Sequence, residues 1–271
     1  MLTHVNGAIA TKSKELTKEL LPFAVEASWK LGKWEPLETL LSNPLCEETF
    51  EVNLGKILLS IKKKDREQFS QLLGQTRESL MAPLAAASME SYSRTYPFIV
   101  KLHMLRELEA GFYNWFGDSQ SSEVLISEKI LADWESRLKV TPISFKIREG
   151  ILNLRRVILE LRSHLSKPQS SKMKEQLNLE IGNCWIQAAK VARKNRFLQT
   201  SYATVIQASN LNVPTYHLER AKCLWDEGKL HKAMIELKNG LTQLEKNKNT
   251  SSPVYNKVFL FYFILFYFIS L

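Results

Sequence analysis

Five histidines and three cysteines are the residues of this sequence whose side chains could serve in metal binding or catalysis. They are His4, His103, His164, His217 and His231, with Cys46, Cys184 and Cys223. No histidine has a cysteine or second histidine partner at zinc-site spacing. His217 and Glu219 are two residues apart, which puts them on different faces of a helix. His103 adjoins Met104 in an apolar stretch, which predicts a packed or hydrogen-bonded core imidazole. We therefore expect no catalytic and no metal-binding residue here.

Motifs of nucleotide chemistry and of secretion are absent as well. The chain has no Gly-x-Gly-x-x-Gly, no Gly-x-x-x-x-Gly-Lys-Ser/Thr loop and no Asp-Phe-Gly or His-Arg-Asp triplet. The cysteines lie far apart, so buried thiols in a reducing compartment are expected rather than a disulfide framework. The first 15 residues lack an apolar h-region, so no signal peptide is expected.

Basic clusters are the remaining candidates for a binding function. The chain has 37 Lys+Arg against 28 Asp+Glu, a net charge of +9, which suits nucleic acid or an acidic protein surface. The clusters are Lys62-Lys63-Lys64, Arg155-Arg156 and Arg193-Lys194-Arg196, all expected at helix ends or flanks, where the helix dipole explains the first and third. The aromatic residues, six tryptophans included, follow apolar faces rather than these clusters. Direct nucleic-acid contact is therefore not expected.

The elements that carry these residues are helices. Only 10 Gly and 9 Pro are present, and apolar residues recur at three- and four-residue steps over 15–41, 79–109 and 147–165. Segments 111–122 and 166–171 have the composition of loops. Three helix–turn–helix units show the turns Gly32-Lys33-Trp34, Asn195-Arg196-Phe197 and Gly228-Lys229-Leu230, and Lys64-Asp65-Arg66 is a weaker fourth.

The turns also repeat at a constant distance. Asn195 to Gly228 and Gly32 to Asp65 are each 33 positions. Helix pairs that repeat at about 34 residues are typical of tetratricopeptide (TPR) arrays. The prediction is an all-α fold, an α-solenoid of TPR-like antiparallel helix pairs, over residues 1–250.

Residues 251–271 differ from the rest of the chain. Val258 to Leu271 is a 14-residue run without charge, and as a helix it would span about 21 Å, less than a hydrocarbon core. We favour the hypothesis that it is a linker plus a hydrophobic tail foreign to the family, translated from a non-coding stretch. A short membrane anchor is the alternative, so no membrane contact is expected unless the 258–271 tail is real.

Three stretches carry a family resemblance. They are residues 83–109 (Pro-Leu-Ala-Ala-Ala-Ser, then Ile-Val-Lys-Leu-His-Met-Leu), residues 184–194 (Cys-Trp-Ile-Gln-Ala-Ala-Lys) and residues 219–228 (Glu-Arg-Ala-Lys-Cys-Leu-Trp). In order and spacing they resemble the FAT domain of ATR-type checkpoint kinases, which belong to the phosphatidylinositol-3-kinase-related kinases. The resemblance covers roughly residues 20–245.

This resemblance implies a regulatory helical scaffold without catalysis of its own. FAT regions stack TPR-like repeats around the kinase domain, relay regulatory signals and contribute to assembly with the partner subunit ATRIP. The parent kinases phosphorylate Ser/Thr in DNA-damage and replication-stress signalling in the nucleus. None of the matching positions is catalytic, cofactor-binding or metal-binding, and ATP and Mg²⁺ would belong to the missing kinase domain. The alternative function is a free-standing TPR-type protein-interaction adaptor.

Overall fold

The computed structural model describes residues 14–116, 128–142, 144–165, 171–211, 213–246 and 252–270. Within these ranges the chain forms twelve helices and no strand, which confirms the all-α prediction. The predicted loop at 111–122 is wrong at its start, because helix continues to Phe116, and residues 117–122 lie outside the described ranges. The chain divides into two compact units, residues 1–140 with 157–168 and residues 141–156 with 169–271.

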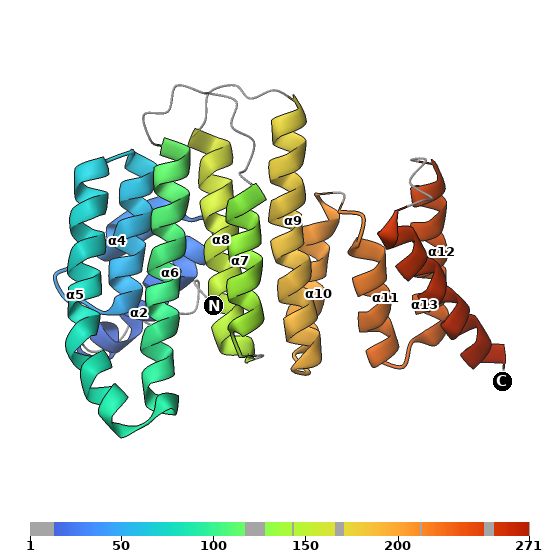
Figure 1. Ribbon diagram of the computed structural model, residues 1–271, viewed down its shortest axis with the longest axis horizontal. Helices are drawn as coiled ribbons and strands as arrows, with labels where there is room; N and C mark the ends of the chain where they lie inside the picture. Colours follow the sequence, from blue (N-terminus) through green and yellow to red (C-terminus); the bar gives the residue numbers. More distant parts are fainter. Residues whose placement is uncertain are drawn as a thin grey trace. The chain divides into compact units, whose positions relative to one another are not determined.

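Unit 1 is a succession of helices in which each packs on the next. Its helices are α2 (Lys14–Lys30), α3 (Trp34–Leu41), α4 (Phe50–Lys63), α5 (Arg66–Glu90), α6 (Tyr92–Phe116) and α7 (Glu128–Val140). The long helices α4, α5 and α6 lie side by side (Figure 1), and α2 packs on both α3 and α4. The predicted helical region 79–109 is two helices, because the backbone of Ser91 is extended between α5 and α6.

Unit 2 repeats this pattern of neighbours. Its helices are α9 (Ser171–Lys194), α10 (Leu198–Ser209), α11 (Tyr216–Asp226), α12 (Leu230–Lys246) and α13 (Pro253–Ser270). Helix α11 packs on α9 and α10 and also on α12 and α13, which are drawn in the reddest colours of Figure 1. The remaining helix, α8 (Phe145–Leu165), contributes residues 145–156 to unit 2 and 157–165 to unit 1.

Among the described helices, four end in the same left-handed motif. The residue with positive φ is Gly32 (65°), Lys64 (58°), Arg196 (64°) or Gly228 (78°). In each case the N–H of the following residue donates to the carbonyl five residues earlier at 2.9–3.0 Å, which is the Schellman arrangement. The N–H of the positive-φ residue itself donates to the carbonyl three residues earlier. The helix–turn–helix units predicted from the sequence are therefore present, and each turn is closed by the same two backbone hydrogen bonds.

Two of the turn residues predicted from the sequence are displaced by one position. Asn195 does not adopt the left-handed conformation; its side chain donates to the carbonyl of Val191 at 2.8 Å, and Arg196 takes that conformation. Asp65 caps α5 by accepting from the N–H of Gln68 at 2.9 Å. The true repeat is thus 32 residues, from Gly32 to Lys64 and from Arg196 to Gly228. Side-chain hydrogen bonding to nearby backbone groups explains why Asn and Asp lie beside the turn residue.

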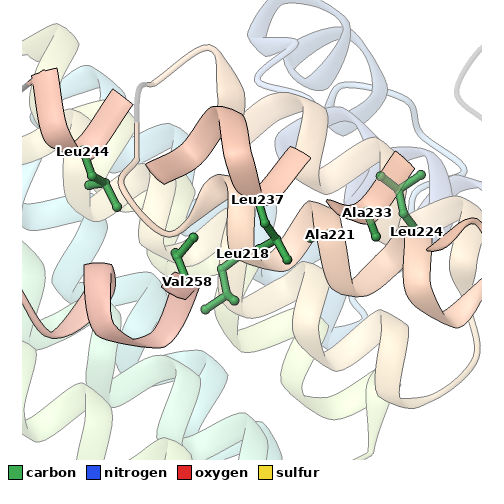
Figure 2. Packing of buried hydrophobic residues seen from close by; sticks show 7 residues of the cluster. All are labelled: Leu218, Ala221, Leu224, Ala233, Leu237, Leu244 and Val258. Carbon is green, nitrogen blue, oxygen red and sulfur yellow. The ribbon is translucent and has the colours of Figure 1, made fainter. Parts of the chain in front are cut away.

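The core of unit 2 shows how its last three helices hold together. Buried apolar residues of α11, α12 and α13 form one cluster (Figure 2): Leu218, Ala221, Leu224, Ala233, Leu237, Leu244 and Val258. Gly240 of α12 allows the two helices of the α11–α12 pair to approach closely, because a Cβ at this position would lie 2.7 Å from Cβ of His217. A larger residue at position 240 would therefore push these two helices apart.

The apolar segment at 253–270 forms α13, and its first turns belong to this core. Val258 is fully buried, and the ring of Phe261 lies 5.8 Å from that of Trp225 on α11. The other side of the helix is exposed, at Phe259, Leu260, Phe263, Ile264, Phe266 and Tyr267. Among the described helices, none has the length and apolar character needed to cross a membrane. That this segment is foreign to the family stays a prediction.

Candidate functional site

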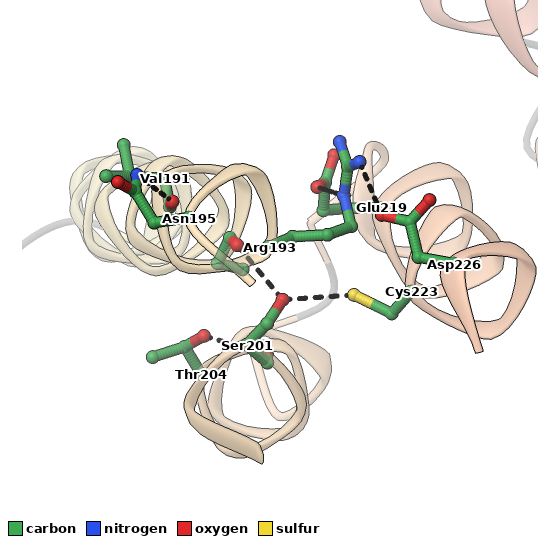
Figure 3. Close-up of polar contacts among 9 residues, drawn as sticks. Val191, Arg193, Asn195, Ser201, Thr204, Glu219, Cys223 and Asp226 are labelled. Carbon is green, nitrogen blue, oxygen red and sulfur yellow. Dashed lines mark hydrogen bonds and ion pairs between the residues drawn. The ribbon is translucent and has the colours of Figure 1, made fainter. Parts of the chain in front are cut away.

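A buried ion network joins α9 to α11 in unit 2. Arg193, near the end of α9, donates from Nε to Oε1 of Glu219 at 2.7 Å and from Nη1 to Oδ2 of Asp226 at 3.1 Å (Figure 3). Glu219 and Asp226 are seven residues apart, so both face α9 from the same side of α11. Glu219 is only 4% exposed. A carboxylate at this depth needs a partner, because an unpaired buried charge costs several kcal/mol.

A second polar contact ties α10 into the same junction. The Ser201 hydroxyl donates to the carbonyl of Ala189 on α9 at 3.0 Å and lies 3.0 Å from Sγ of Cys223 on α11 (Figure 3). Because the single hydroxyl hydrogen is used on Ala189, the thiol of Cys223 is the donor to Ser201 Oγ. Ser201 and Cys223 are both fully buried. One residue from each of three helices thus meets in a buried contact.

The polar residues of this junction stabilise the packing of the helices and do not form a reactive site. Burial raises the pKa of the Cys223 thiol, and the charges of Glu219 and Asp226 raise it further, against the opposing charge of Arg193. A thiol with a raised pKa stays protonated at neutral pH and is a poor nucleophile. Its hydrogen-bond partner is the Ser201 hydroxyl, which is not a base. The residues therefore lock α9, α10 and α11 together rather than attack a substrate.

His217 forms a third polar contact, between α11 and α12. Its Nδ1 lies 2.7 Å from Oε1 of Glu236, and its Nε2 lies 2.6 Å from Oε1 of Gln243. Burial by itself lowers the pKa of His217, but the two hydrogen bonds and the charge of Glu236 outweigh it and raise the pKa above 6.5. Arg220 Nε also lies 3.6 Å from Oε2 of Glu236. As expected, His217 and Glu219 serve different faces of α11.

Most side chains of the basic clusters identified in the sequence contact other residues of the chain. Lys62 lies over the ring of Trp34, Lys63 pairs with Glu38 at 2.5 Å, and Lys64 Nζ donates to the Leu165 carbonyl at 2.8 Å. The expectation that all clusters lie at helix ends or flanks is wrong for one pair. Arg155 and Arg156 are both 4% exposed in the middle of α8, and the guanidinium of Arg156 lies 4.4 Å from the Trp185 ring centroid.

The other candidate residues are scattered. His103 is half-buried, His164 and His231 are exposed, and His4 lies outside the described residues. None of the three cysteines is in a disulfide bond; Cys184 and Cys223 are buried and Cys46 is partly exposed. Trp29 and Trp134 are buried in the core, as predicted for the tryptophans, whereas Trp34, Trp185 and Trp225 are half-buried. The described residues contain no cluster of three metal-ligating side chains.

Sequence reasoning does not find the Arg193 network. The sequence pattern places Arg193 in a basic cluster that the helix dipole explains, and it leaves the partners of this side chain unidentified. The available signal is the spacing of Glu219 and Asp226, two carboxylates seven residues apart and therefore on one face of a helix. Two acidic residues aligned in this way require a cation from a neighbouring helix when that face is buried.

The comparisons with known proteins agree with this all-helical architecture. The family model of the FAT domain matches residues 21–257. The serine/threonine-protein kinase ATR of Arabidopsis thaliana is 33% identical over 94% of this chain, and that of Oryza sativa subsp. indica is 33% identical over 90%. The ATR kinase of Drosophila melanogaster is 28% identical over 80%. The chain spans about 9% of the length of each of these relatives. A match over most of the chain to the family model, together with these relatives, shows that the chain belongs to the FAT domain family of the serine/threonine kinases related to ATR.

Proposed function

We propose that this chain is the helical scaffold of an ATR-type serine/threonine kinase, which supports the kinase domain and binds a partner subunit of the ATRIP type. The observation that carries the proposal is the match to ATR kinases over at least 90% of the chain in two plants. The kinase would act in DNA-damage and replication-stress signalling in the nucleus. ATP and Mg²⁺ would be bound by its kinase domain.

A scaffold role is supported by the way in which the buried polar residues of unit 2 are used. The Arg193 network, the Ser201–Cys223 contact and the His217 contact each connect neighbouring helices. Rigid helix-to-helix junctions let a solenoid hold a large domain in place and transmit a displacement along its length. A scaffold of this kind acts through its surface.

A domain replacement in the Arabidopsis kinase tests the proposal. The segment of that kinase matched by residues 21–257 is replaced by this chain's residues, and the chimera is expressed in plants that lack their own enzyme. We expect kinase activity on a Ser/Thr peptide and survival of replication stress. The matched control carries Arg193→Ala, which breaks the α9–α11 junction and should reduce both. A chimera that is folded but inactive would contradict the proposal.

A further inference from the structure

The outward face of α5 changes from polar to apolar along the helix. The opposite face is directed to the core and is buried from Phe69 to Ala87. In the first turns the outward face exposes Gln71, Gln75 and Glu78, as is usual for a surface helix. From residue 79 to residue 89, however, no side chain carries a charge, and the same face exposes apolar side chains. These are Met81, Ala82, Ala85, Ala86 and Met89.

The first residue of α6 extends this apolar surface. Met81, Met89 and Tyr92 are 58%, 91% and 73% exposed. Helix α5 packs on α4 and α6, and the turn between α5 and α6 lies at the lower end of unit 1 in Figure 1. A helical segment that is apolar on both sides is normally buried on both, whereas the described residues cover only one side of this segment. We call the exposed residues 81, 82, 85, 86, 89 and 92 the α5–α6 patch.

The order of side chains along the patch suits contact with an identical helix. Ala82, Ala85 and Ala86 lie between Met81 and Met89, which are about 12 Å apart along the helix. Two crossed helices are closest at the crossing point, about 8 Å apart where side chains are small, and they separate towards their ends. Small side chains at the centre and long ones at the ends therefore fill the space between such helices, and methionine adapts to the shape of that space.

The patch has the area that a weak dimer needs. At about 200 Å² for a fully exposed large side chain, Met81, Met89 and Tyr92 present about 450 Å². The three alanine methyl groups add about 100 Å². Two copies would bury about 1,100 Å² in total, which exceeds the roughly 800 Å² of incidental contacts and lies at the lower end of specific interfaces. We expect a dissociation constant on the order of 10 µM.

We propose that the α5–α6 patch binds the same patch of a second copy of this chain, with the two α5 helices antiparallel and crossing at Ala85. Such a contact is isologous, because each copy contributes the same residues about a two-fold axis. The exposed carboxylate of Glu78, on the same face, sets the orientation. An antiparallel pair keeps the two Glu78 side chains about 20 Å apart, whereas a parallel pair would place these like charges side by side. This inference goes beyond the proposed function and does not depend on it.

Analytical ultracentrifugation of the full chain over about 1–200 µM tests the proposal. The chain carries Leu260→Glu/Phe263→Lys/Tyr267→Glu, because the exposed face of α13 is a second route to association. We expect a reversible monomer–dimer equilibrium, which Ala85→Glu/Met89→Lys should weaken at least about tenfold by placing charges in the contact. The matched control, Gln71→Glu/Gln75→Lys, introduces the same residues at the same spacing on the same face and should dimerise as the parent does. Circular dichroism checks each fold; if the patch variant unfolds, the single change Met89→Gln at an exposed position replaces it.

Cross-linking tests the register of the two helices. Cys46→Ser first removes the partly exposed native thiol. Ala85→Cys should then be joined to its counterpart by a bis-maleimide with a spacer of about 10 Å, because the two positions meet at the crossing point. Gln71→Cys is the control and should stay unlinked, because its two copies lie about 40 Å apart in the antiparallel pair.

Three results would overturn the inference. A chain that stays monomeric at about 200 µM rejects a second copy as the occupant, and an apolar helix of another protein would then be the candidate. A dimer that persists in the patch variant, or that the control variant weakens equally, does not use this surface. Cross-linking at position 71 but not at position 85 excludes the antiparallel arrangement.

Discussion

Arg196 and Lys64 occupy backbone positions that glycine occupies in the two sister turns. A left-handed conformation costs a residue with a Cβ about 1–2 kcal/mol, and glycine loses part of that advantage through its freer unfolded chain. Arg196 is exposed, and its side chain makes no hydrogen bond or ion pair with the described residues, so its conformation is the property that matters. A substitution at position 196 therefore measures the free energy that the left-handed backbone conformation costs a residue with a Cβ.

We expect Arg196→Gly to raise the free energy of unfolding by about 0.5–1 kcal/mol. The reciprocal change, Gly228→Ala, should lower it by about 1 kcal/mol, because φ at Gly228 is 78° while no atom crowds the site. Urea unfolding of both variants measures the two effects. Loss of stability in Arg196→Gly would mean that the arginine side chain stabilises the turn by a contact of its own.

The sequence predicts a residue's conformation where a single backbone preference determines it. It does not predict which side chains of different helices form hydrogen bonds or ion pairs with one another. Gly32 and Gly228 are identifiable because glycine tolerates positive φ. The same rule favours Asn195 over Arg196, but the amide of Asn195 bonds to the nearby carbonyl of Val191 instead. The partners of Arg193 depend on which helices become neighbours, and no local pattern contains that information.

At the scale of paired elements, the α9–α11 junction depends on a charge that must stay paired. We expect Arg193→Ala to lower the free energy of unfolding by about 3 kcal/mol, because Glu219 would remain buried without a cation. Arg193→Met with Glu219→Met should recover most of the loss, since a buried pair can be replaced by apolar side chains of similar volume.

The control for the Arg193 and Glu219 variants is an exposed ion pair on another helix. Lys139 and Glu135 of α7 are 71% and 66% exposed, so Lys139→Ala should change the free energy of unfolding by less than about 0.5 kcal/mol. Urea unfolding compares all variants. If the double variant is as unstable as Arg193→Ala, the junction needs hydrogen bonds rather than only the absence of an unpaired charge.

The α11–α12 pair should respond to pH through His217. Its pKa is raised in the folded chain, so its contribution to stability is complete below the unfolded value near 6.5 and is lost as pH rises through the folded value. The groups that face it are Glu236 and Gln243 on α12 and Arg220 on its own helix. Protonation favours folding because both ring nitrogens then donate to acceptor oxygens.

We therefore expect stability to fall as pH rises above about 6.5, and His217→Gln to remove that fall. Thermal unfolding across this pH range measures it. The control is His231→Gln, which alters an exposed histidine of α12 and should keep the pH dependence. The same dependence in His217→Gln would assign the effect to another group.

Helix formation is the part of the fold that the sequence predicts best. Apolar residues at three- and four-residue steps mark one face of each helix, and that signal is local. The division at Ser91 escapes prediction because apolar residues recur at helical steps on both sides of it, and the end of α6 is misplaced because the predicted loop begins at Gly111, whereas the helix continues to Phe116, directly before Gly117. The burial of Arg155 and Arg156 escapes it for a related reason: arginine is usually a surface residue, whereas its stem and planar head can also pack on a ring such as that of Trp185.

At the scale of the whole molecule, α13 combines a buried face with an exposed apolar face. Val258 is fully buried against α11 and α12, while Leu260, Phe263 and Tyr267, at three- and four-residue steps, are 61%, 61% and 62% exposed. A contiguous apolar face of this kind promotes association between copies. Removing all of α13 would relieve that exposure but would also uncover the core that Val258 closes, worth about 1.5–3 kcal/mol for this side chain alone.

We therefore expect Leu260→Glu/Phe263→Lys/Tyr267→Glu to increase the soluble monomer fraction strongly while changing the free energy of unfolding by no more than about 0.5 kcal/mol. A chain ending at Ser252 should be less aggregation-prone than the parent but less stable than this variant, because it loses Val258 and Phe261 from the core. Size-exclusion chromatography and urea unfolding measure the two properties together. The matched control, Val258→Lys, places a charge on the buried face of the same helix and should disrupt the α11–α13 packing. Equal destabilisation by the triple variant and by Val258→Lys would show that the outer face is covered in solution, and α13 would then be an internal helix of a larger assembly rather than an exposed edge.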